Sequence, residues 1–249
     1  MIFQLLVLFI LPLLSGLLIY LLPDGKIANF KLLLVFAGSY LFAITVVHIL
    51  PEVFVEATGK GWVGAFVLIG FFLQQGLEYF TSGIEHGHIH THGDGNHHHH
   101  KHVSAFVLLT ALCIHAFLEG GILVTTGHSV GWSEMNAVLI GIVLHRAPAA
   151  FALMAVLSIQ LNSKRKAIPY LVVFSMAAPA GLLISKYLTD LQILNETGVL
   201  YLYALVSGNF LHISTTIVFE SSPDHHFNAR KLVVAILGAM VAVGIEYLT

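Results

Sequence analysis

Long apolar runs separated by short polar stretches make up almost the whole chain. A membrane-spanning helix needs about 20 mostly apolar residues, because each residue adds about 1.5 Å and the hydrocarbon core is about 30 Å thick. Eight segments meet this requirement, near residues 1–22, 30–50, 62–80, 103–126, 135–158, 168–187, 197–219 and 231–248. The pattern predicts an all-α polytopic membrane protein with eight transmembrane helices, and residues 1–249 form a single transmembrane domain.

The first apolar run, residues 1–22, is interpreted as a membrane helix and not as a signal peptide. It has no basic region at its start and no small-residue cleavage pattern before Asp24. Eight spans would place both termini on the same side of the membrane.

The composition supports solvation by lipid. Hydrophobic residues make up 57% of the chain and charged residues only 10%, whereas soluble domains carry roughly a quarter charged residues. The lipid bilayer is therefore an expected partner. The formal net charge of -2 argues against a nucleic-acid partner, which would need a basic face. The single cysteine, Cys113, excludes an intramolecular disulfide.

Basic residues are distributed unevenly between the two sets of loops. With eight spans, one set of loops holds only Lys60 and Lys186. The opposite set holds Lys26, Lys31, Lys101, Lys164, Arg165, Lys166, Arg230 and Lys231. Because cytosolic loops carry the excess of Lys and Arg, we expect both termini outside and the loop at 83–102 in the cytosol.

That loop, residues 83–102, is rich in histidine. Nine of the sixteen histidines lie in it: His86, His88, His90, His92, His97, His98, His99, His100 and His102. Its internal position and its spaced His-X-His pattern argue against a purification tag. Because neutral imidazoles are common zinc ligands, we interpret the loop as a metal-binding modulator or buffer and not as the transport site.

A short internal repeat relates the second and seventh predicted spans. Gly38-Ser39-Tyr40-Leu41 resembles Gly208-Asn209-Phe210-Leu211, and a threonine follows each at the same offset. The odd connectivity between the two spans makes an inverted repeat one interpretation, and transporters of that architecture bind substrate at the repeat interface. Chance similarity is the alternative.

Two ionisable residues share one face of the fourth predicted span. His115 and Glu119 are four residues apart, so their side chains lie one turn from each other on a helix. Ionisable groups inside spans are costly and default to functional hypotheses. An imidazole and a carboxylate so placed suit zinc and similar ions. A plain buried hydrogen bond is the alternative at this point.

The fifth predicted span carries a second polar group. His145 and Arg146 lie deep in an apolar run, and Pro148 leaves the carbonyl of Leu144 without its helical donor. Freed carbonyls are tolerated in membranes where they line a polar cavity. The pattern indicates a cavity wall, and a structural Arg–Glu pair with bystander histidines is the alternative.

Three further polar residues are candidates for the ion pathway or for support of the ligands. His48 and Glu52 lie near the end of the second predicted span, and His212 lies on the seventh. Arg146 belongs to the same supporting group. Hydrogen bonding between helices explains His48 and His212 as well as metal passage does.

Together these motifs resemble the ZIP family of metal transporters over nearly the whole chain. The most specific match is His145-Arg146-Ala147-Pro148-Ala149-Ala150-Phe151, which is similar to the His-Lys-Ala-Pro-Ala-Ala-Phe signature of one ZIP branch. Residues 174–179 and 36–52 also resemble ZIP spans six and two.

The resemblance implies two inverted three-helix repeats around spans four and five. It also implies passage of Zn²⁺, and in some members Fe²⁺, Mn²⁺ or Cd²⁺, towards the cytosol. We expect this passage to proceed by alternating access. His115, Glu119 and His145 match metal ligands of the family.

The chain departs from the family pattern at three residues. Ala116 replaces an asparagine, Ala149 replaces a glutamate, and Arg146 stands where many members have an acidic residue. A permanently charged Arg146 would repel a second cation. We therefore expect a one-metal site, with Arg146 in place of a second ion and balancing Glu119.

Other functions were weighed against transport. A b-type haem carrier could use His48, His115, His145 and His212, but a carboxylate beside His115 fits axial ligation poorly. An intramembrane metalloprotease would need a HEXXH motif, which the chain lacks. A metal-sensing receptor of the same fold stays open.

The overall expectation is a zinc transporter and not an enzyme. Zinc is its transported substrate, with Fe²⁺, Mn²⁺ or Cd²⁺ as alternatives, and no organic cofactor is expected. A bacterial inner membrane is the favoured location, and a homodimer is kept open beside a monomer.

Overall fold

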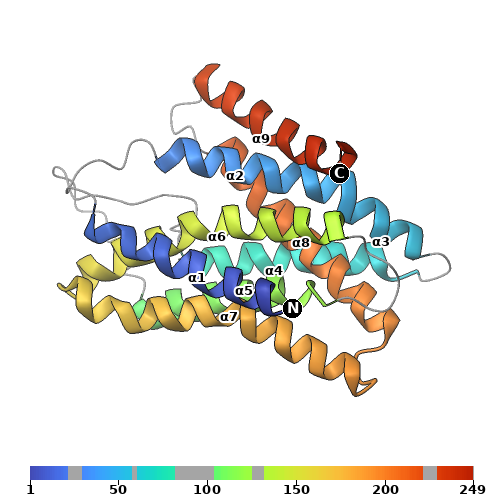
Figure 1. The fold of residues 1–249 in the computed structure, drawn as a ribbon, viewed down its shortest axis with the longest axis horizontal. Coiled ribbons are helices and arrows are strands. Elements are labelled where there is room, and N and C mark those ends of the chain that lie inside the picture. Colours follow the sequence, from blue (N-terminus) through green and yellow to red (C-terminus); the bar gives the residue numbers. More distant parts are fainter. Residues whose placement is uncertain (22–29, 58–60, 82–103, 125–131, 221–228, 249) are drawn as a thin grey trace.

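The computed structural model describes residues 1–21, 30–57, 61–81, 104–124, 132–220 and 229–248 (Figure 1). Its helices are α1 (Ile2–Leu17) with the 3₁₀ turn η1 (Leu18–Tyr20), α2 (Phe30–Ile44), the π-helical turn η2 (Thr45–Ile49), α3 (Leu50–Glu56), α4 (Val63–Thr81), α5 (Ala105–Gly121), α6 (Trp132–Gln160), α7 (Lys164–Asp190), α8 (Glu196–Glu220) and α9 (Ala229–Leu248). Within these ranges every regular element is helical, which confirms the all-α prediction. Because α2, η2 and α3 run on without a break, there are eight helical stretches in the described chain.

The second stretch is longer than predicted, since it continues past residue 50 to Glu56. Pro51 lies at the start of α3, and a proline ring inside a helix collides with the carbonyl four residues earlier. The π-turn η2 widens the helix immediately before Pro51 and so accommodates the ring. His48 lies in this widened turn.

Several helices are long and apolar enough to cross a membrane. Five described helical stretches qualify: Ile2–Tyr20, Leu32–Glu56, Val63–Phe80, Ala137–Gln160 and Lys164–Asp190, and Ala105–Gly121 is a shorter apolar helix. Large apolar side chains also face outward, among them Phe3, Phe72, Ile184 and Met240. Lipid solvates such a surface, whereas water would not. The fold is that of a polytopic membrane protein.

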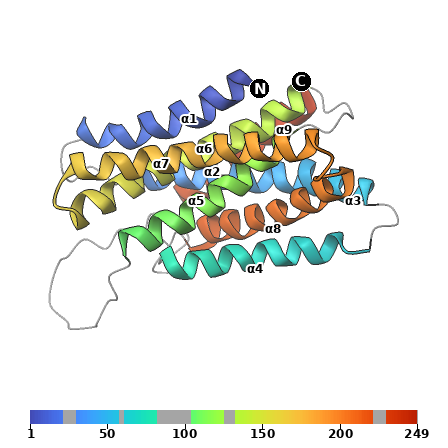
Figure 2. The same ribbon diagram turned by 90° about the horizontal axis from the view of Figure 1, so that it is seen from below.

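The helices form two groups. The first, called the central unit, contains α1, α5, α6 and α7, with α5 on α7 and α1 on α6. The second, called the flanking unit, contains α2, α3, α4, α8 and α9, with α4 on α8 and α2 on α9. Contacts of α2 with α6 and of α4 with α5 join the units. Figure 1 shows α9 and α7 at opposite edges of the bundle, and Figure 2 shows α1 and α4 at opposite edges from below.

The packing follows the inverted-repeat pattern. Exchanging α1 with α7, α2 with α8, α4 with α9 and α5 with α6 converts the α4–α8 contact into α9–α2 and the α5–α7 contact into α6–α1. The repeat motif behaves alike in both halves, because Thr45 and Thr215 each donate to the carbonyl of the fourth preceding residue, at 2.7 Å. Tyr40 and Phe210 are both fully buried.

Small residues let α5 and α7 approach closely beside the candidate site. A Cβ atom on Gly120 would overlap the carbonyl of Ala178, and one on Gly181 would overlap the carbonyl of Phe117. Such close backbone approach is how membrane helices gain packing energy without a hydrophobic driving force. This contact fixes the α5 turn that carries Glu119.

Candidate metal centre

Helix α5 holds the first two candidate ligands on its inward face. The regular helix places His115 and Glu119 one turn apart, and both are buried, Glu119 completely. His115 Nε2 lies 3.1 Å from Glu119 Oε1. Neither oxygen of Glu119 accepts a well-aligned hydrogen bond from any described residue. A carboxylate buried in this way is costly, and two donors directed at one cation would explain the arrangement.

Helix α6 brings in the third candidate ligand. The rings of His115 and His145 lie 5.6 Å apart, centre to centre, and are almost perpendicular. One donor atom from each of His115, Glu119 and His145 lies within 4.8 Å of the other two. Among the described residues this is the one group of three or more such side chains that converges in this way. The structure thus brings together the three residues predicted as ligands.

The proline in α6 behaves as a local modifier and not as a break. Pro148 lies inside α6, which continues to Gln160. Ser15 of α1 donates to the carbonyl of Ala147 at 2.5 Å, so a side chain from the neighbouring helix supplies a donor beside the proline. Such side-chain compensation is how membrane helices tolerate proline.

Arg146 is buried beside the three donors but is anchored to α7. Its Nη2 donates to the carbonyl of Phe174 at 3.0 Å, and its guanidinium lies 4.9 Å from the centre of the Phe174 ring. The Nε and Nη1 atoms make no hydrogen bond with any described residue. Arg146 and Glu119 influence each other electrostatically, but the hydrogen bond of Arg146 goes to Phe174. The structure therefore does not show a direct Arg–Glu pair.

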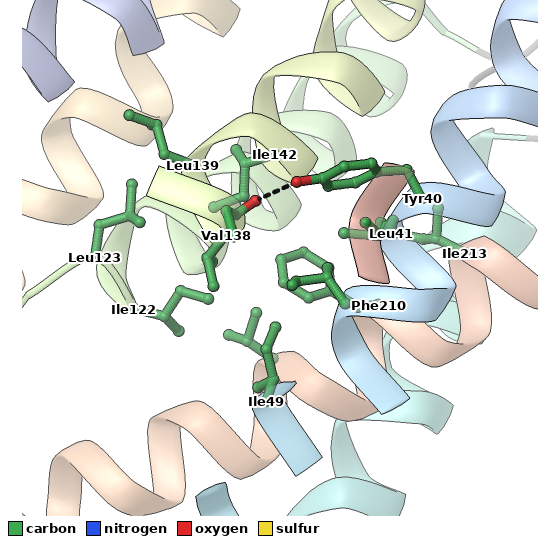
Figure 3. Close-up of a cluster of buried hydrophobic side chains, with 14 of the residues drawn as sticks. Tyr40, Leu41, Ile49, Ile122, Leu123, Val138, Leu139, Ile142, Phe210 and Ile213 are labelled. Atoms are coloured by element: carbon green, nitrogen blue, oxygen red, sulfur yellow. Dashed lines mark hydrogen bonds between the residues drawn. The ribbon is translucent and has the colours of Figure 1, made fainter. Parts of the chain in front are cut away.

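An apolar cluster covers the donors at one end of the bundle. Ile122 follows Glu119 by three residues and caps the end of α5, and Ile142 precedes His145 by three residues on α6, so both lie one turn towards the same end. Figure 3 shows this cluster, which also contains Tyr40, Leu41, Ile49, Leu123, Val138, Leu139, Phe210 and Ile213. The Tyr40 hydroxyl donates to the carbonyl of Ala137 at 3.1 Å across the unit boundary.

A second apolar cluster lies on the other side of the donors, among α1, α5, α6 and α7. It includes Leu112 and Ala116 of α5 and Ala149 of α6. The three donors therefore lie between two apolar clusters, where a charge without a partner is costly.

Comparison with known protein families identifies the family of this helical bundle. The family model described as ZIP Zinc transporter matches residues 82–246. The chain belongs to the ZIP family. This confirms the resemblance inferred from the sequence motifs, and it places the chain in a family of transporters and not of enzymes, as expected.

Two curated ZIP relatives give the scale of the similarity. Zinc transporter ZIP9-A of Xenopus laevis is 33% identical over 121 residues, which are 45% of this chain and 38% of that protein. Zinc transporter ZIP9 of Macaca fascicularis is 34% identical over 113 residues, 42% of this chain and 46% of that protein. The match spans less than half the length of each relative.

In this ZIP bundle, His48 and Glu52 do not join the central donors. His48 Nδ1 lies 2.9 Å from Glu246 Oε1 of α9, and His48 Nε2 lies 3.5 Å from Glu52 Oε2. We call His48, Glu52 and Glu246 the His48 triad. Glu246 was not predicted as a site residue, although an isolated acid near the end of the last apolar run was a signal for it.

His212 also lies outside the central group. Its Nε2 lies 2.5 Å from Glu78 Oε2 of α4, and the Phe71 ring contacts it edge-on. The pairing of α8 with α4 here corresponds to the pairing of α2 with α9 in the His48 triad under the inverted repeat. A haem would need two histidines facing each other across a porphyrin. His48, His115 and His212 each contact a carboxylate instead.

One residue at the centre was not identified from the sequence as part of the site. Asn209 of α8 is completely buried, and its Nδ2 lies 3.0 Å from His115 Nδ1. In the repeat motif Asn209 is equivalent to Ser39. Only the packing of α8 shows that Asn209 contacts His115 of α5. The nine loop histidines lie outside the described residues.

Proposed function

We propose that this ZIP chain transports a divalent transition metal across the membrane through a centre formed by His115, Glu119 and His145. The observation that carries the proposal is the convergence of three buried donors between two apolar clusters. Buried charge at this depth persists where it has a function. An electron carrier or a protease would need groups that the described residues around the centre do not supply.

Zinc is the substrate that the donors favour. Two imidazole nitrogens and one carboxylate oxygen form a mixed set that zinc accepts in tetrahedral geometry, with water in the remaining position. Fe²⁺, Mn²⁺ and Cd²⁺ stay as alternative substrates, since ligand type alone separates these ions weakly. The chemistry of binding and release asks for no organic cofactor.

The centre holds one ion at a time in this proposal. Arg146 keeps its positive charge beside the donors, and Ala116 and Ala149 offer no oxygen ligands. The anchoring of Arg146 on Phe174 supports this view, because the guanidinium cannot withdraw without losing a buried hydrogen bond. Arg146 thus balances the charge of Glu119 where a second metal would otherwise be needed.

Alternating access fits the two-unit packing. All three donors belong to the central unit, whereas Tyr40, Ile49 and Phe210 of the apolar cover belong to the flanking unit. Movement of the central unit against the flanking unit would separate the two sides of this cover. The cover would then open while the three donors keep their mutual geometry.

The proposed direction is towards the cytosol. The excess of basic residues puts the termini outside and residues 83–102 in the cytosol. The end of the bundle covered by the apolar cluster is then the outer end, because α5 runs outward from that loop. The bacterial inner membrane, the homodimer and the single domain over residues 1–249 stay predictions.

Zinc uptake into liposomes tests the proposal. The purified full chain is reconstituted around a fluorescent zinc indicator, and external Zn²⁺ is titrated. We expect saturable uptake that falls by more than about tenfold in His115→Ala and in His145→Ala, because each loses a direct ligand. Ser214→Ala, a buried change on α8 at a hydroxyl that donates to the carbonyl of Leu211 on its own helix, is the matched control and should transport normally.

Two results would overturn the proposal. Uptake of Zn²⁺, Fe²⁺, Mn²⁺ and Cd²⁺ that survives both alanine changes would remove the donors from the pathway. Tight zinc binding by the intact chain without uptake of any of these ions would indicate a metal-sensing receptor.

A further inference from the structure

Tyr40 brings a polar group into the apolar cluster that covers one end of the three donors. The other residues of this cover that Figure 3 labels have aliphatic or phenyl side chains, without polar atoms. Tyr40 is completely buried, and its hydroxyl donates to the carbonyl of Ala137 at 3.1 Å. The direction of the bond is fixed, because a carbonyl oxygen only accepts. The contact is thus one donor held on one acceptor inside an otherwise apolar cover.

Gly141 allows the Tyr40 ring to reach this carbonyl. Gly141 follows Ala137 by four residues on α6, so both lie on the same face of the helix. A Cβ atom at Gly141 would lie 3.2 Å from Cε1 of the ring, so a side chain there would make the ring shift. In a regular helix the Gly141 amide uses one lone pair of the Ala137 carbonyl, which leaves the second for the phenol. One turn of α6 therefore provides both the space and the acceptor.

The contact joins the two units of the bundle. Tyr40 belongs to α2 of the flanking unit, whereas Ala137 and Gly141 belong to α6 of the central unit, which also carries His145. If the units separate at this end, water reaches both the hydroxyl and the carbonyl. The net gain from the closed contact is then small, equivalent to about a two- to tenfold change in the ratio of closed to open molecules. A contact of this size shifts an equilibrium and does not fix one state.

The other half of the repeat has the same ring without the hydroxyl. Phe210 occupies the position equivalent to Tyr40 and is also completely buried. In transporters with inverted repeats, access alternates as one group of helices moves against the other around the substrate site. A donor that is present in one half only therefore makes the two access states unequal in energy.

We propose that Tyr40 controls access to the metal centre, because its hydroxyl on Ala137 favours the state in which the apolar cover is closed. This inference rests on the proposed function, since it requires the cover to open and close. Tyr40 acts on the position of the two units and not on the ion, so it is a positioning residue. Gly141 is the second part of the arrangement, because it lets the ring lie against α6.

Labelling of a buried cysteine measures how often the cover opens. The chain has one cysteine, so Cys113→Ser together with Ile122→Cys leaves a single thiol, at a position in the cover where 1% of the native side chain is exposed. A water-soluble maleimide then reacts with the purified chain in detergent at a rate proportional to the open fraction. We expect Tyr40→Phe to raise this rate about two- to tenfold, because it removes the hydroxyl and keeps the ring.

Tyr201→Phe is the matched control. The Tyr201 ring stacks on Phe66 of α4 within the flanking unit, with ring centres 4.4 Å apart, so the same chemical change lies away from the unit boundary. Its labelling rate should equal that of the background chain. Chains with Cys113 as their single thiol are the second control, since general loosening of the fold in Tyr40→Phe would raise the labelling of Cys113 as well. A rise of the same size in either control would reject the inference, as would an unchanged rate in Tyr40→Phe.

Gly141→Ala tests the second part of the arrangement and also serves if Tyr40→Phe proves unstable. The added methyl group moves the ring away from Ala137, so the labelling rate should rise in this variant too. Combined with Tyr40→Phe it should add less than its separate effect, because one hydrogen bond can be lost only once. Effects that multiply independently would show that ring packing holds the cover without the hydroxyl, and would reject the inference.

Zinc uptake by the intact chain separates the two possible failures. If the intact chain takes up no divalent metal, the proposed function fails, whatever the labelling rates. If it takes up Zn²⁺ and Tyr40→Phe is labelled like the background chain, only the role of Tyr40 fails.

Discussion

Two helices of this protein carry the same pair of residues at the same spacing, yet the pairs have different surroundings. His115 and Glu119 on α5 meet a third donor, His145, and all three converge within 4.8 Å. His48 and Glu52 meet Glu246 instead, and the two carboxylates contact opposite nitrogens of one ring. In the first arrangement three residues each bring one possible ligand atom to the same place, whereas in the second the imidazole itself lies between the two carboxylates.

The spacing of a His–Glu pair on a helix therefore does not by itself determine what the pair binds. In the His48 triad each ring nitrogen lies within 3.5 Å of a carboxylate oxygen, so the ring is a bridge between η2 and α9. The environments also differ, because Glu119 is fully buried while 29% of Glu52 is exposed. We infer that the third residue and the exclusion of water decide whether such a pair binds a metal or forms only a structural contact between helices.

Neutralising one carboxylate in each region tests this difference most directly. Glu119→Gln removes a direct ligand, and we expect Zn²⁺ affinity to fall by more than about 100-fold, beyond the range typical of a supporting residue. Glu246→Gln makes the same chemical change in the His48 triad and should leave the affinity within a fewfold of wild type. Calorimetry on the two purified variants measures both.

Equal losses in the two variants would contradict the distinction. The His48 triad would then be a second binding site of similar weight. In that case the prediction from the sequence that His48 and Glu52 take part in metal passage would be favoured over a structural role.

The sequence predicted the local part of both regions. The spacing of His115 and Glu119 guaranteed a shared face, because helical periodicity depends only on neighbours in the chain. The apolar runs predicted the helices for the same reason. The π-turn at His48 was not predicted, since it depends on how the chain relieves Pro51.

The partners from distant helices could not be predicted in the same way. Glu246 is 198 residues from His48, and Asn209 is 94 residues from His115. In a membrane bundle the outward faces are as apolar as the inward ones, so hydrophobicity does not show which face turns inward. Arg146 illustrates the limit, because its hydrogen bond to the carbonyl of Phe174, 28 residues away, could not be inferred from the sequence.

Changing the charge beside the centre tests the role of Arg146. Arg146→Asp replaces a fixed cation with a carboxylate next to His145, so a second ion no longer meets a positive charge. We expect the Zn²⁺ stoichiometry to rise from one ion to two per chain. Equilibrium dialysis with metal analysis measures it, and Lys164→Asp, a charge reversal at the start of α7, is the control.

Unchanged binding of one ion with unchanged transport in Arg146→Asp would reject the role assigned to Arg146. A loss of folding would be recognised separately by size-exclusion chromatography. Arg146→Met, which keeps most of the side-chain volume, then distinguishes lost charge from lost packing.

The smallest effect on Zn²⁺ affinity is expected in the His48 triad. His48→Gln removes the imidazole between Glu52 and Glu246, which should cost about 1–3 kcal/mol of stability, the usual cost of losing a hydrogen bond to a charged group. Zn²⁺ affinity at the centre should stay within about twofold, since sites without shared partners act independently. Thermal unfolding in detergent and calorimetry measure the two quantities on the same preparation.

A double variant distinguishes a structural role of His48 from a role in metal passage. If His48 stabilises the fold by bridging two helices, then adding Glu246→Gln to His48→Gln should restore part of the lost stability. The reason is that the Glu246 carboxylate, which has lost its contact with His48, is then no longer charged. The two changes would then be less costly together than the sum of each alone. If the stability effects instead add independently while zinc uptake falls with His48→Gln, the imidazole acts on the ion and the two regions share one chemistry after all.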